Sequence, residues 1–261
     1  MAVKGKVIVI TGASSGIGAA LAKKAAEKGH YPVLIARSKN KLENLKEEIE
    51  NKGKSCSIYQ IDVTNEQEVN QFVIFLHELF SKVDVLINNA GVGRFALTED
   101  LTVEKTKEML EVNVLSVFYL VKAVLPAMKK NRSGHIINIG SQAGRLATPR
   151  SSIYAASKHA LIGFSNALRL ETEPYHIYVS TVNPGPVRTP FFQKADPSGN
   201  YEKAVEKLFI EPDDLAKKVM HIIEKPKREL NTPWWMACLS KLHGLFPSLI
   251  ERAGKKQFQK K

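Results

Sequence analysis

The amino-acid sequence predicts an α/β domain built on a doubly wound parallel sheet, with helices on both faces. Short apolar segments alternate with longer helical ones along most of the 261 residues, which is the pattern of repeated strand–helix–strand units. The apolar segments are almost continuously hydrophobic, as expected for strands that are buried on both faces of a sheet. Hydrophobic residues make up 44% of the chain and charged residues 25%, so the composition excludes a disordered or fibrous protein.

The expected elements follow one another in a regular order. Strands are expected at Lys6–Thr11, Tyr31–Ala36, Ser55–Ile61, Val83–Ile87, Gly134–Ile139 and Ile177–Val182. Helices are expected at Gly16–Lys28, Asn40–Asn51, Thr102–Lys130 and Ser152–Glu173. A capping-box sequence at Thr64–Gln67 opens a further expected helix, which runs to about Phe80. Beyond Pro184 an irregular stretch leads to two further helices. We interpret residues 1–261 as one Rossmann-type domain, with a substrate-loop and helical region at 185–224 and an amphipathic, basic extension at 233–261.

Cysteine content and hydrophobic patterning indicate the cellular compartment of the protein. Two cysteines, Cys56 and Cys238, cannot form a disulfide framework, which favours a reducing compartment. Met1–Gly5 leads directly into the first strand, and no run of about 18 uncharged apolar residues is present. We therefore expect a soluble, cytoplasmic protein whose contact with a membrane is at most peripheral.

The positive charge is unevenly distributed. The net charge is +12, and nine Lys or Arg against two Glu place +7 of it between Lys225 and Lys261. A basic surface can attract nucleic acid or anionic lipid. Because no nucleic-acid motif accompanies the charge, we expect no nucleic-acid partner.

The first strand is followed by a glycine-rich turn. In a doubly wound sheet, ligands bind beyond the carboxyl ends of the strands, and Thr11–Gly18 (TGASSGIG) lies at such an end. A glycine turn that opens a helix presents backbone N–H groups and a positive dipole end to a phosphate. An ordinary strand–helix turn is the alternative, but three glycines favour the phosphate site.

The next two strands end in further polar residues. An acidic residue about 20 positions after the glycines would hold the ribose hydroxyls of NAD, whereas this chain has Arg37 and Lys39 there. Two cations suit a 2′-phosphate, and a solvated helix start is the alternative. Asp62, after the third strand, could accept a hydrogen bond from an adenine amino group. Asn88–Gly91, after the fourth, either lines a cofactor or only reverses the chain.

A tyrosine and a lysine are spaced to act together. Tyr154 and Lys158 are four residues apart and share one face of the expected helix. A nearby cation lowers the pKa of a phenol toward the working pH of a general acid or base. Ser141, after the fifth strand, could bind the reacting oxygen. By itself this spacing also occurs by chance, and Asn113 in the preceding helix is equally well explained as a hydrogen-bonded structural residue.

In this order and spacing, the motifs closely resemble those of the classical short-chain dehydrogenase/reductase family, from Lys6 to Glu224. TGASSGIG matches TGxxxGxG, NNAG stands at Asn88–Gly91, and PGPVRT matches PGxxxT. Asn113, Ser141, Tyr154 and Lys158 fall where the family has its catalytic tetrad. The resemblance implies that Tyr154 is the general acid/base, that Lys158 lowers its pKa and binds the nicotinamide ribose, that Ser141 positions the substrate oxygen, and that Asn113 supports a water relay.

The resemblance also implies a nicotinamide cofactor. Its contacts are expected at Gly12, Ser14, Ser15, Gly16, Ile17, Gly18, Arg37, Asp62, Val63, Asn89, Ala90, Gly91, Tyr154, Lys158, Pro184, Gly185, Val187 and Thr189. Arg37 in place of a ribose-binding acid is similar to the NADP-preferring subgroup, so NADP(H) is expected rather than NAD(H). Ser15 departs from members with a basic residue inside the glycine motif, which leaves Arg37 as the main phosphate ligand. No metal site is expected.

The expected activity is hydride transfer between nicotinamide and a carbonyl or secondary alcohol, by a homodimer or homotetramer. Phe95, Phe191 and Phe192 suggest a hydrophobic substrate or a packed lid. A catalytically idle, NADPH-binding regulatory protein is the alternative function.

The last segment carries an apolar stripe. Pro233–Trp235 begins an expected helix with a stripe at Trp234, Cys238, Leu242, Leu245, Phe246, Leu249 and Ile250, and basic residues follow. Pro247 is expected to bend or end that helix. The tail resembles those of a lipid- or steroid-related branch of the family. A membrane-surface helix fits this pattern, and a cover over the substrate site or a subunit contact fits it at least as well.

Overall fold

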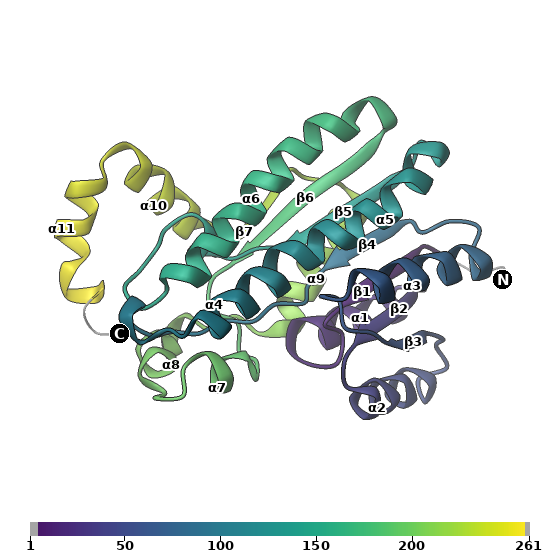
Figure 1. The fold of residues 1–261 in the computed structure, drawn as a ribbon, viewed down its shortest axis with the longest axis horizontal. Helices are drawn as coiled ribbons and strands as arrows, with labels where there is room; N and C mark the ends of the chain where they lie inside the picture. The colour runs from purple at the N-terminus through teal and green to yellow at the C-terminus, as the bar shows by residue number, and fades with distance from the viewer. Residues whose placement is uncertain (1–4, 259–261) are drawn as a thin grey trace.

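Seven parallel strands form the central sheet of the protein. The computed structural model describes residues 5–258, and Figure 1 shows the sheet between two layers of helices. The strand order is β3-β2-β1-β4-β5-β6-β7. The strands are β1 (Val7–Thr11), β2 (Tyr31–Ala36), β3 (Ser57–Gln60), β4 (Val85–Asn88), β5 (Gly134–Ile139), β6 (Ile177–Pro184) and β7 (Glu229–Thr232). The chain order reverses between β1 and β4, which is where a doubly wound sheet places its ligand. The predicted fold class is confirmed.

The helices occupy both faces of this sheet. They are α1 (Gly16–Glu27), α2 (Lys39–Glu50), α3 (Glu66–Leu79), α4 (Val103–Leu110), α5 (Ser116–Asn131), α6 (Ser152–Thr172), α7 (Phe191–Ala195), α8 (Asn200–Val205), α9 (Pro212–Glu224), α10 (Trp234–Leu245) and α11 (Pro247–Phe258). Short 3₁₀ turns lie at Thr98–Asp100, Gln142–Gly144, Glu173–Tyr175 and Glu206–Leu208. α1, α2 and α9 cover one face, and α3, α5 and α6 the other.

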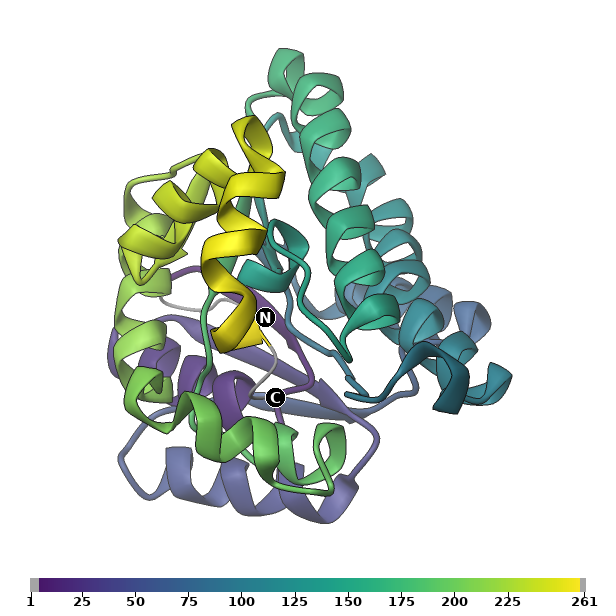
Figure 2. The same cartoon turned by 90° about the vertical axis from the view of Figure 1, so that its left-hand side faces the viewer.

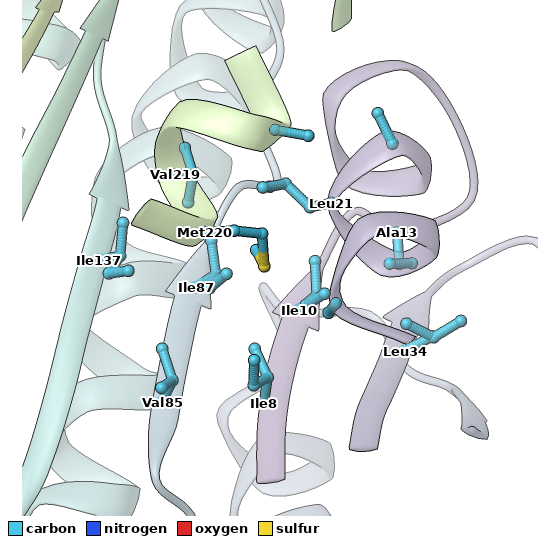
Figure 3. Packing of buried hydrophobic residues seen from close by; sticks show 14 of the residues in the cluster. Ile8, Ile10, Ala13, Leu21, Leu34, Val85, Ile87, Ile137, Val219 and Met220 are labelled. Carbon is cyan, nitrogen blue, oxygen red and sulfur yellow. The ribbon is translucent and has the colours of Figure 1, made fainter. Parts of the chain in front are cut away.

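Alternation of side chains along β1 builds both core layers. Ile8 and Ile10 belong to the cluster under α1 and α9, whereas Val7 and Val9 belong to the cluster under α3, α5 and α6. In Figure 3, Ile10 lies close to Met220 of α9. Because every side chain of β1 is buried, the carboxyl end of the strand is held rigidly beneath the glycine-rich turn.

The helix expected at Thr102–Lys130 is interrupted, which corrects the prediction of one continuous helix. α4 and α5 are joined by a π-helical turn at Glu111–Leu115, which accommodates an additional residue within the helix. The segment Val103–Asn131 is long and apolar enough to cross a membrane by length and composition. Its inner face, however, packs Val117, Leu120 and Val124 against the sheet, as in the core helices of globular folds.

Three further details differ from the expected elements. Beyond Pro184 the described residues form five helices, α7 to α11, where two were expected. β7 was not expected, because Glu229–Thr232 (ELNT) lacks an apolar run, yet it pairs in parallel with β6 at the sheet edge. α3 has Asn65 as its N-cap, whose Oδ1 accepts from the backbone N–H groups of Gln67 and Glu68 at 3.0 and 3.2 Å. Thr64, the first residue of the expected capping box, instead binds Asp62.

Candidate active site

The turn between β1 and α1 forms a cradle of exposed backbone. Gly12 and Gly16 have φ of +62° and +53°, a region that L side chains rarely adopt. A Cβ on Gly18 would lie 2.3 Å from the carbonyl oxygen of Gly12, so only glycine lets the helix approach the turn this closely. The first turn of α1 has no acidic residue, and the N-cap Ser15 makes no side-chain cap hydrogen bond. Its N–H groups and dipole are therefore available to an anion.

Asn89 and Thr11 lock the turn after β4 against this cradle. The Thr11 hydroxyl oxygen accepts from the N–H groups of Asn89 and Ala90 at 2.9 and 2.8 Å. The Asn89 Nδ2 donates in return to the carbonyl oxygens of Thr11 and Gly12 at 2.9 and 3.3 Å. The side chain of Asn89 thus shapes the cleft through the backbone, and Asn89, Ala90 and Gly91 all line it.

One end of the cleft is positively charged. Arg37, Ser38 and Lys41 line it at the carboxyl end of β2 and the start of α2. Lys39, which was expected beside Arg37, lies outside the lining and pairs with Glu43 at 3.7 Å on the helix surface. Lys41 lines the cleft instead. It was missed because the sequence does not show which of the neighbouring cations at the start of α2 faces the cleft. The first turn of α2 has no acidic side chain.

Asp62 and Val63 line the cleft at the carboxyl end of β3. The Asp62 Oδ1 accepts from the N–H and the hydroxyl of Thr64 at 3.0 and 2.8 Å. These bonds fix the orientation of the carboxylate. The contact of Asp62 and Val63 with an adenine ring stays a prediction.

Asn113 lies in the π-helical turn and is almost completely buried, with 1% of its surface exposed. Its Oδ1 accepts from the N–H of Val92, and its Nδ2 donates to the carbonyl oxygen of Val92, both at 2.9 Å. The same Nδ2 donates to the Ser157 hydroxyl at 3.0 Å. Both N–H donors of Asn113 are thus used, and it joins the segment after β4 to α6 from behind the cleft.

Tyr154 and Ser141 come together at the floor of the cleft. Tyr154 projects from α6, and Ser141 follows β5, where its Oγ accepts from the N–H of Ala143 at 3.1 Å. Burial raises the pKa of Tyr154 to about 12, and a hydrogen bond with Ser141 acts in the opposite direction. The expected net lowering of this pKa is therefore wrong for this structure, because the desolvation of the phenolate outweighs the favourable contact.

Lys158 is buried one turn along α6 from Tyr154. Its Nζ donates to the carbonyl oxygen of Ile139 at 2.9 Å and lies 5.9 Å from the centre of the Tyr154 ring. Burial lowers the pKa of Lys158 to about 8. The geometry therefore places a cation that can change its charge near neutral pH beside the phenol and Gly91.

The segment after β6 closes the other side of the cleft. The lining there includes Pro184, Gly185, Val187 and Thr189. Val187 forms a parallel bridge with Ile210, and the site for a Cβ on Gly16 lies 3.0 Å from the Thr189 side chain. The loop thus reaches across to the glycine-rich turn. Of the expected site residues, only Gly18 and Asn113 lie outside the lining, and both support it from behind.

An aromatic pocket adjoins Tyr154 within the same cleft, whose volume is 1180 Å³. Phe95 lies edge-on to Tyr154 with ring centres 5.7 Å apart, and Phe191 lies 5.8 Å from Tyr154. Tyr201 lies 4.6 Å from Phe95. Lining residues not singled out from the sequence include Gln142, Leu146, Tyr201, Val205, Leu208, Met236 and Leu239. Tyr201 and Val205 lie on α8, and Met236 and Leu239 lie on α10, helices that only tertiary packing brings to the site.

The last helices present two different faces. Trp235, Met236 and Leu239 of α10 line the cleft, so a helix does cover part of the substrate side, as one interpretation of the sequence held. The expected stripe is not the covering face, because Trp234, Cys238, Leu242, Leu245 and Leu249 are exposed. α10 ends at Leu245 and Pro247 begins α11, which confirms the break at Pro247. Lys260 and Lys261 lie outside the described residues.

A family model described as short chain dehydrogenase matches residues 6–199. The chain belongs to the short-chain dehydrogenase family. It is an oxidoreductase of this type with a Rossmann-type nucleotide-binding fold. Within residues 5–258, no group of three His, Cys, Asp or Glu side chains could hold a metal ion.

Relatives of this short-chain dehydrogenase are similar over most of its length. An uncharacterized oxidoreductase of Staphylococcus saprophyticus is 35% identical, over 85% of this chain and 92% of the relative. A short-chain dehydrogenase from Streptomyces avermitilis superimposes with a TM-score of 0.82 at 26% identity, over 98% of both chains. One from Sphingobium yanoikuyae, solved in complex with NADPH, has a TM-score of 0.79 at 30% identity, over 93% of this chain and 95% of that one.

Proposed function

We propose that this short-chain dehydrogenase uses NADP(H) to transfer a hydride between nicotinamide and a carbonyl or secondary alcohol, and that its substrates are lipophilic. One observation carries the proposal: a single cleft joins a glycine-rich phosphate cradle, the cations Arg37 and Lys41 and the Tyr154–Ser141 pair. A related enzyme of known structure binds NADPH, which supports the choice of cofactor.

The residues present fit a phosphorylated dinucleotide. The glycine-rich turn offers backbone space and N–H groups to a pyrophosphate. Arg37 and Lys41 offer charge-assisted hydrogen bonds to a 2′-phosphate. Asp62 and Val63 would hold the adenine, and Lys158 the ribose near the reacting end. When bound, the dinucleotide supplies the hydride for reduction or accepts it for oxidation.

Tyr154 is placed to deliver the proton in the reductive direction. Because its pKa is raised to about 12, the phenol keeps its proton at neutral pH. Ser141 can hold the substrate oxygen beside the phenol, and the positive charge of Lys158 stabilises the phenolate that forms on proton transfer. The Asn113 Oδ1 accepts one hydrogen bond, from Val92, and has a second lone pair. In the proposed water relay, a water molecule would donate a hydrogen bond to this lone pair.

The aromatic pocket supports a lipophilic substrate. Phe95, Phe191 and Tyr201 form an apolar surface beside Tyr154. The nearby cation Arg94 donates to the carbonyl oxygens of Gly93 and Lys194 at 2.9 and 3.1 Å. Its Nη2 lies 3.8 Å from the Glu108 carboxylate, so Arg94 has a charge partner within the protein and stabilises the pocket wall rather than a substrate anion. An uncharged carbonyl compound with aromatic or aliphatic substituents fits this surface best.

We also propose a homodimer or homotetramer in the cytoplasm. An apolar groove of 410 Å³ lies between α5 and α6, with Phe118, Leu125, Phe164 and Leu168 in its lining. Phe118 is exposed, and exposed apolar grooves commonly mark contact surfaces. Light scattering during gel filtration would give the number of subunits, and Phe118→Glu should reduce it if this groove forms the contact.

The function is tested with the purified full-length protein. We would mix it with NADPH or NADH and a series of aldehydes and ketones of increasing apolar size, and follow cofactor absorbance. We expect turnover with NADPH that improves with apolar substituents and is lost in Tyr154→Phe. Tight NADPH binding without turnover of any carbonyl compound would instead identify a regulatory protein.

A further inference from the structure

The helices α10 and α11 form a hairpin at the end of the molecule where the cleft opens. Figure 1 shows them beyond the sheet, on the same side as α7 and α8, and Figure 2 shows them in yellow on the near side of the molecule. Met236 anchors the hairpin, because its Sδ lies 3.0 Å from the site for a Cβ on Gly185. The buried Ser240 hydroxyl donates to the carbonyl oxygen of Ala237 at 2.9 Å. The inner face of α10 therefore contacts the segment after β6 and lines the cleft.

The outer face of the hairpin is apolar and uncovered within the described structure. Trp234 is 74% exposed, Leu245 71% and Leu249 65%. Leu242 and Phe246 are also exposed. Contiguous apolar surface of this kind is uncommon on proteins without a docking partner. We call this set, Trp234, Leu242, Leu245, Phe246 and Leu249, the outer stripe.

Charge indicates what covers the outer stripe. Lys241 and Arg252 are exposed on the hairpin, and the segment 233–261 has a net charge of +5. Its acidic residue Glu251 pairs with His243 at 3.2 Å. A basic rim beside an apolar stripe with an exposed tryptophan is typical of helices that lie in the plane of an anionic membrane surface.

A second copy of the chain fits this surface less well. A two-fold contact places the same patch of both subunits together, so it would bring two segments of charge +5 into apposition. Anionic headgroups would instead neutralise the charge while the acyl boundary takes up the stripe. Nucleic acid would neutralise the charge and leave the stripe exposed.

We propose that the α10–α11 hairpin docks this short-chain dehydrogenase onto an anionic lipid bilayer surface. The outer stripe enters the boundary between headgroups and acyl chains, and Lys241 and Arg252 contact the headgroups. The hairpin lies on the bilayer without crossing it, since α10 has 12 residues and is broken from α11 at Phe246–Pro247. The proposal does not depend on the cofactor or the reaction.

The test is co-sedimentation of the full-length protein with vesicles. One set contains phosphatidylglycerol and phosphatidylcholine, and the other contains phosphatidylcholine alone, each at low and high salt. We expect binding to the anionic vesicles that weakens with salt. Lys241→Glu with Arg252→Glu should weaken it by more than about 30-fold, since each surface cation contributes about a factor of five.

The double variant Leu245→Glu, Leu249→Glu tests the stripe without disturbing the core, because both side chains are exposed. Its matched control is Ile74→Glu with Val103→Glu, at side chains that are 62% and 63% exposed on α3 and α4. Loss of vesicle binding in the first variant and its retention in the control support the proposal. Absence of wild-type binding to anionic vesicles, or equal loss in the control, overturns it. An oligomer that the stripe variant dissociates, without vesicle binding by the wild type, overturns it in favour of a subunit contact.

Discussion

Lys158 and Tyr154 are one helical turn apart on α6, yet the lysine ammonium is bonded to the carbonyl oxygen of Ile139, 2.9 Å away, and lies 5.9 Å from the centre of the tyrosine ring. β5 thus holds the cation at a fixed distance from the phenol. Both groups are disfavoured in their charged forms by burial. Proton transfer from Tyr154 and the charge of Lys158 are therefore coupled, because each charge stabilises the other in a low dielectric.

Removal of the Tyr154 hydroxyl should abolish most turnover. Tyr154→Phe keeps the ring contacts with Phe95 and Phe191 but loses the proton donor. We expect kcat to fall by about 10²–10⁴-fold, the usual contribution of a general acid, while the Kd for NADPH changes little. Steady-state kinetics and fluorescence titration with NADPH would measure both quantities. Near wild-type turnover in this variant would show that another group delivers the proton.

Coenzyme preference should depend on Arg37. A charge-assisted contact contributes about 1.5–3 kcal/mol, so we expect NADPH to bind roughly 10–150-fold more tightly than NADH. Arg37→Asp should reverse the preference, because the carboxylate repels the 2′-phosphate and accepts from ribose hydroxyls. Lys39→Asp is the matched control, since Lys39 lies outside the cleft lining. Equal affinity of the wild-type protein for the two coenzymes would contradict this assignment.

NADPH affinity should decrease as the pH rises through about 8. Burial lowers the pKa of Lys158 to about 8, so its ammonium loses a proton above that pH and no longer attracts the dinucleotide. Isothermal titration between pH 7 and 9.5 should show a rising Kd. In Lys158→Ala the affinity should be weaker throughout and should change less over this range. A wild-type Kd that is constant with pH would show that Lys158 keeps its charge.

Asn113 should stabilise the fold as well as the site. Asn113→Ala leaves the partly buried N–H and carbonyl of Val92 without their partner, and we expect a loss of about 1–3 kcal/mol in the free energy of unfolding. Urea denaturation would measure it. Ser157→Ala removes only one of the hydrogen bonds of Asn113 and should cost less. If the two variants were equally stable, the bonds to Val92 would contribute little.

Acid should destabilise the protein through His135. This side chain is buried, its Nε2 lies 2.8 Å from the Ser180 hydroxyl, and burial lowers its pKa to about 4. Between pH 6.5 and 4 the unfolded chain takes up a proton that the folded chain excludes. Stability is therefore lost as the pH falls through this range, by up to about 3 kcal/mol.

His135→Gln should flatten this dependence, and His77→Gln, at an exposed position on α3, should leave it unchanged. Chemical denaturation at a series of pH values would give the slopes. The assignment to His135 would be untenable if its variant kept the wild-type slope.

Much of the site could be predicted because its residues follow strands. The apolar run Tyr31–Ala36 coincides with β2 and Gly134–Ile139 with β5, and parallel strands bring their carboxyl ends to one edge. Arg37 and Ser141 then come next to the glycine-rich turn without any knowledge of helix packing. Lys41 and Met236 could not be found in this way, because they reach the cleft from helices whose rotation and position depend on tertiary contacts.

The remaining differences have local causes. β7 is polar and lies at the sheet edge, where pairing with β6 rather than burial makes a strand. Lys158 was expected to depress the pKa of Tyr154, but spacing along a helix contains no information on desolvation. Hydrophobic periodicity also does not reveal one additional residue in a long helix, as at Glu111–Leu115.

Because of that additional residue, the position of Asn113 depends on the number of residues in this helix. In a regular α-helix each residue turns the chain by about 100° and advances it by about 1.5 Å. Deleting one residue from the π-helical turn would restore regular winding and leave α4 and α5 nearly in their present relative rotation, because a π turn winds one more residue through about the same angle as an α turn. Asn113 would move off the backbone of Val92 although every motif residue was still present. Sequence changes that alter side chains are therefore tolerated more easily along this segment than a change in its number of residues.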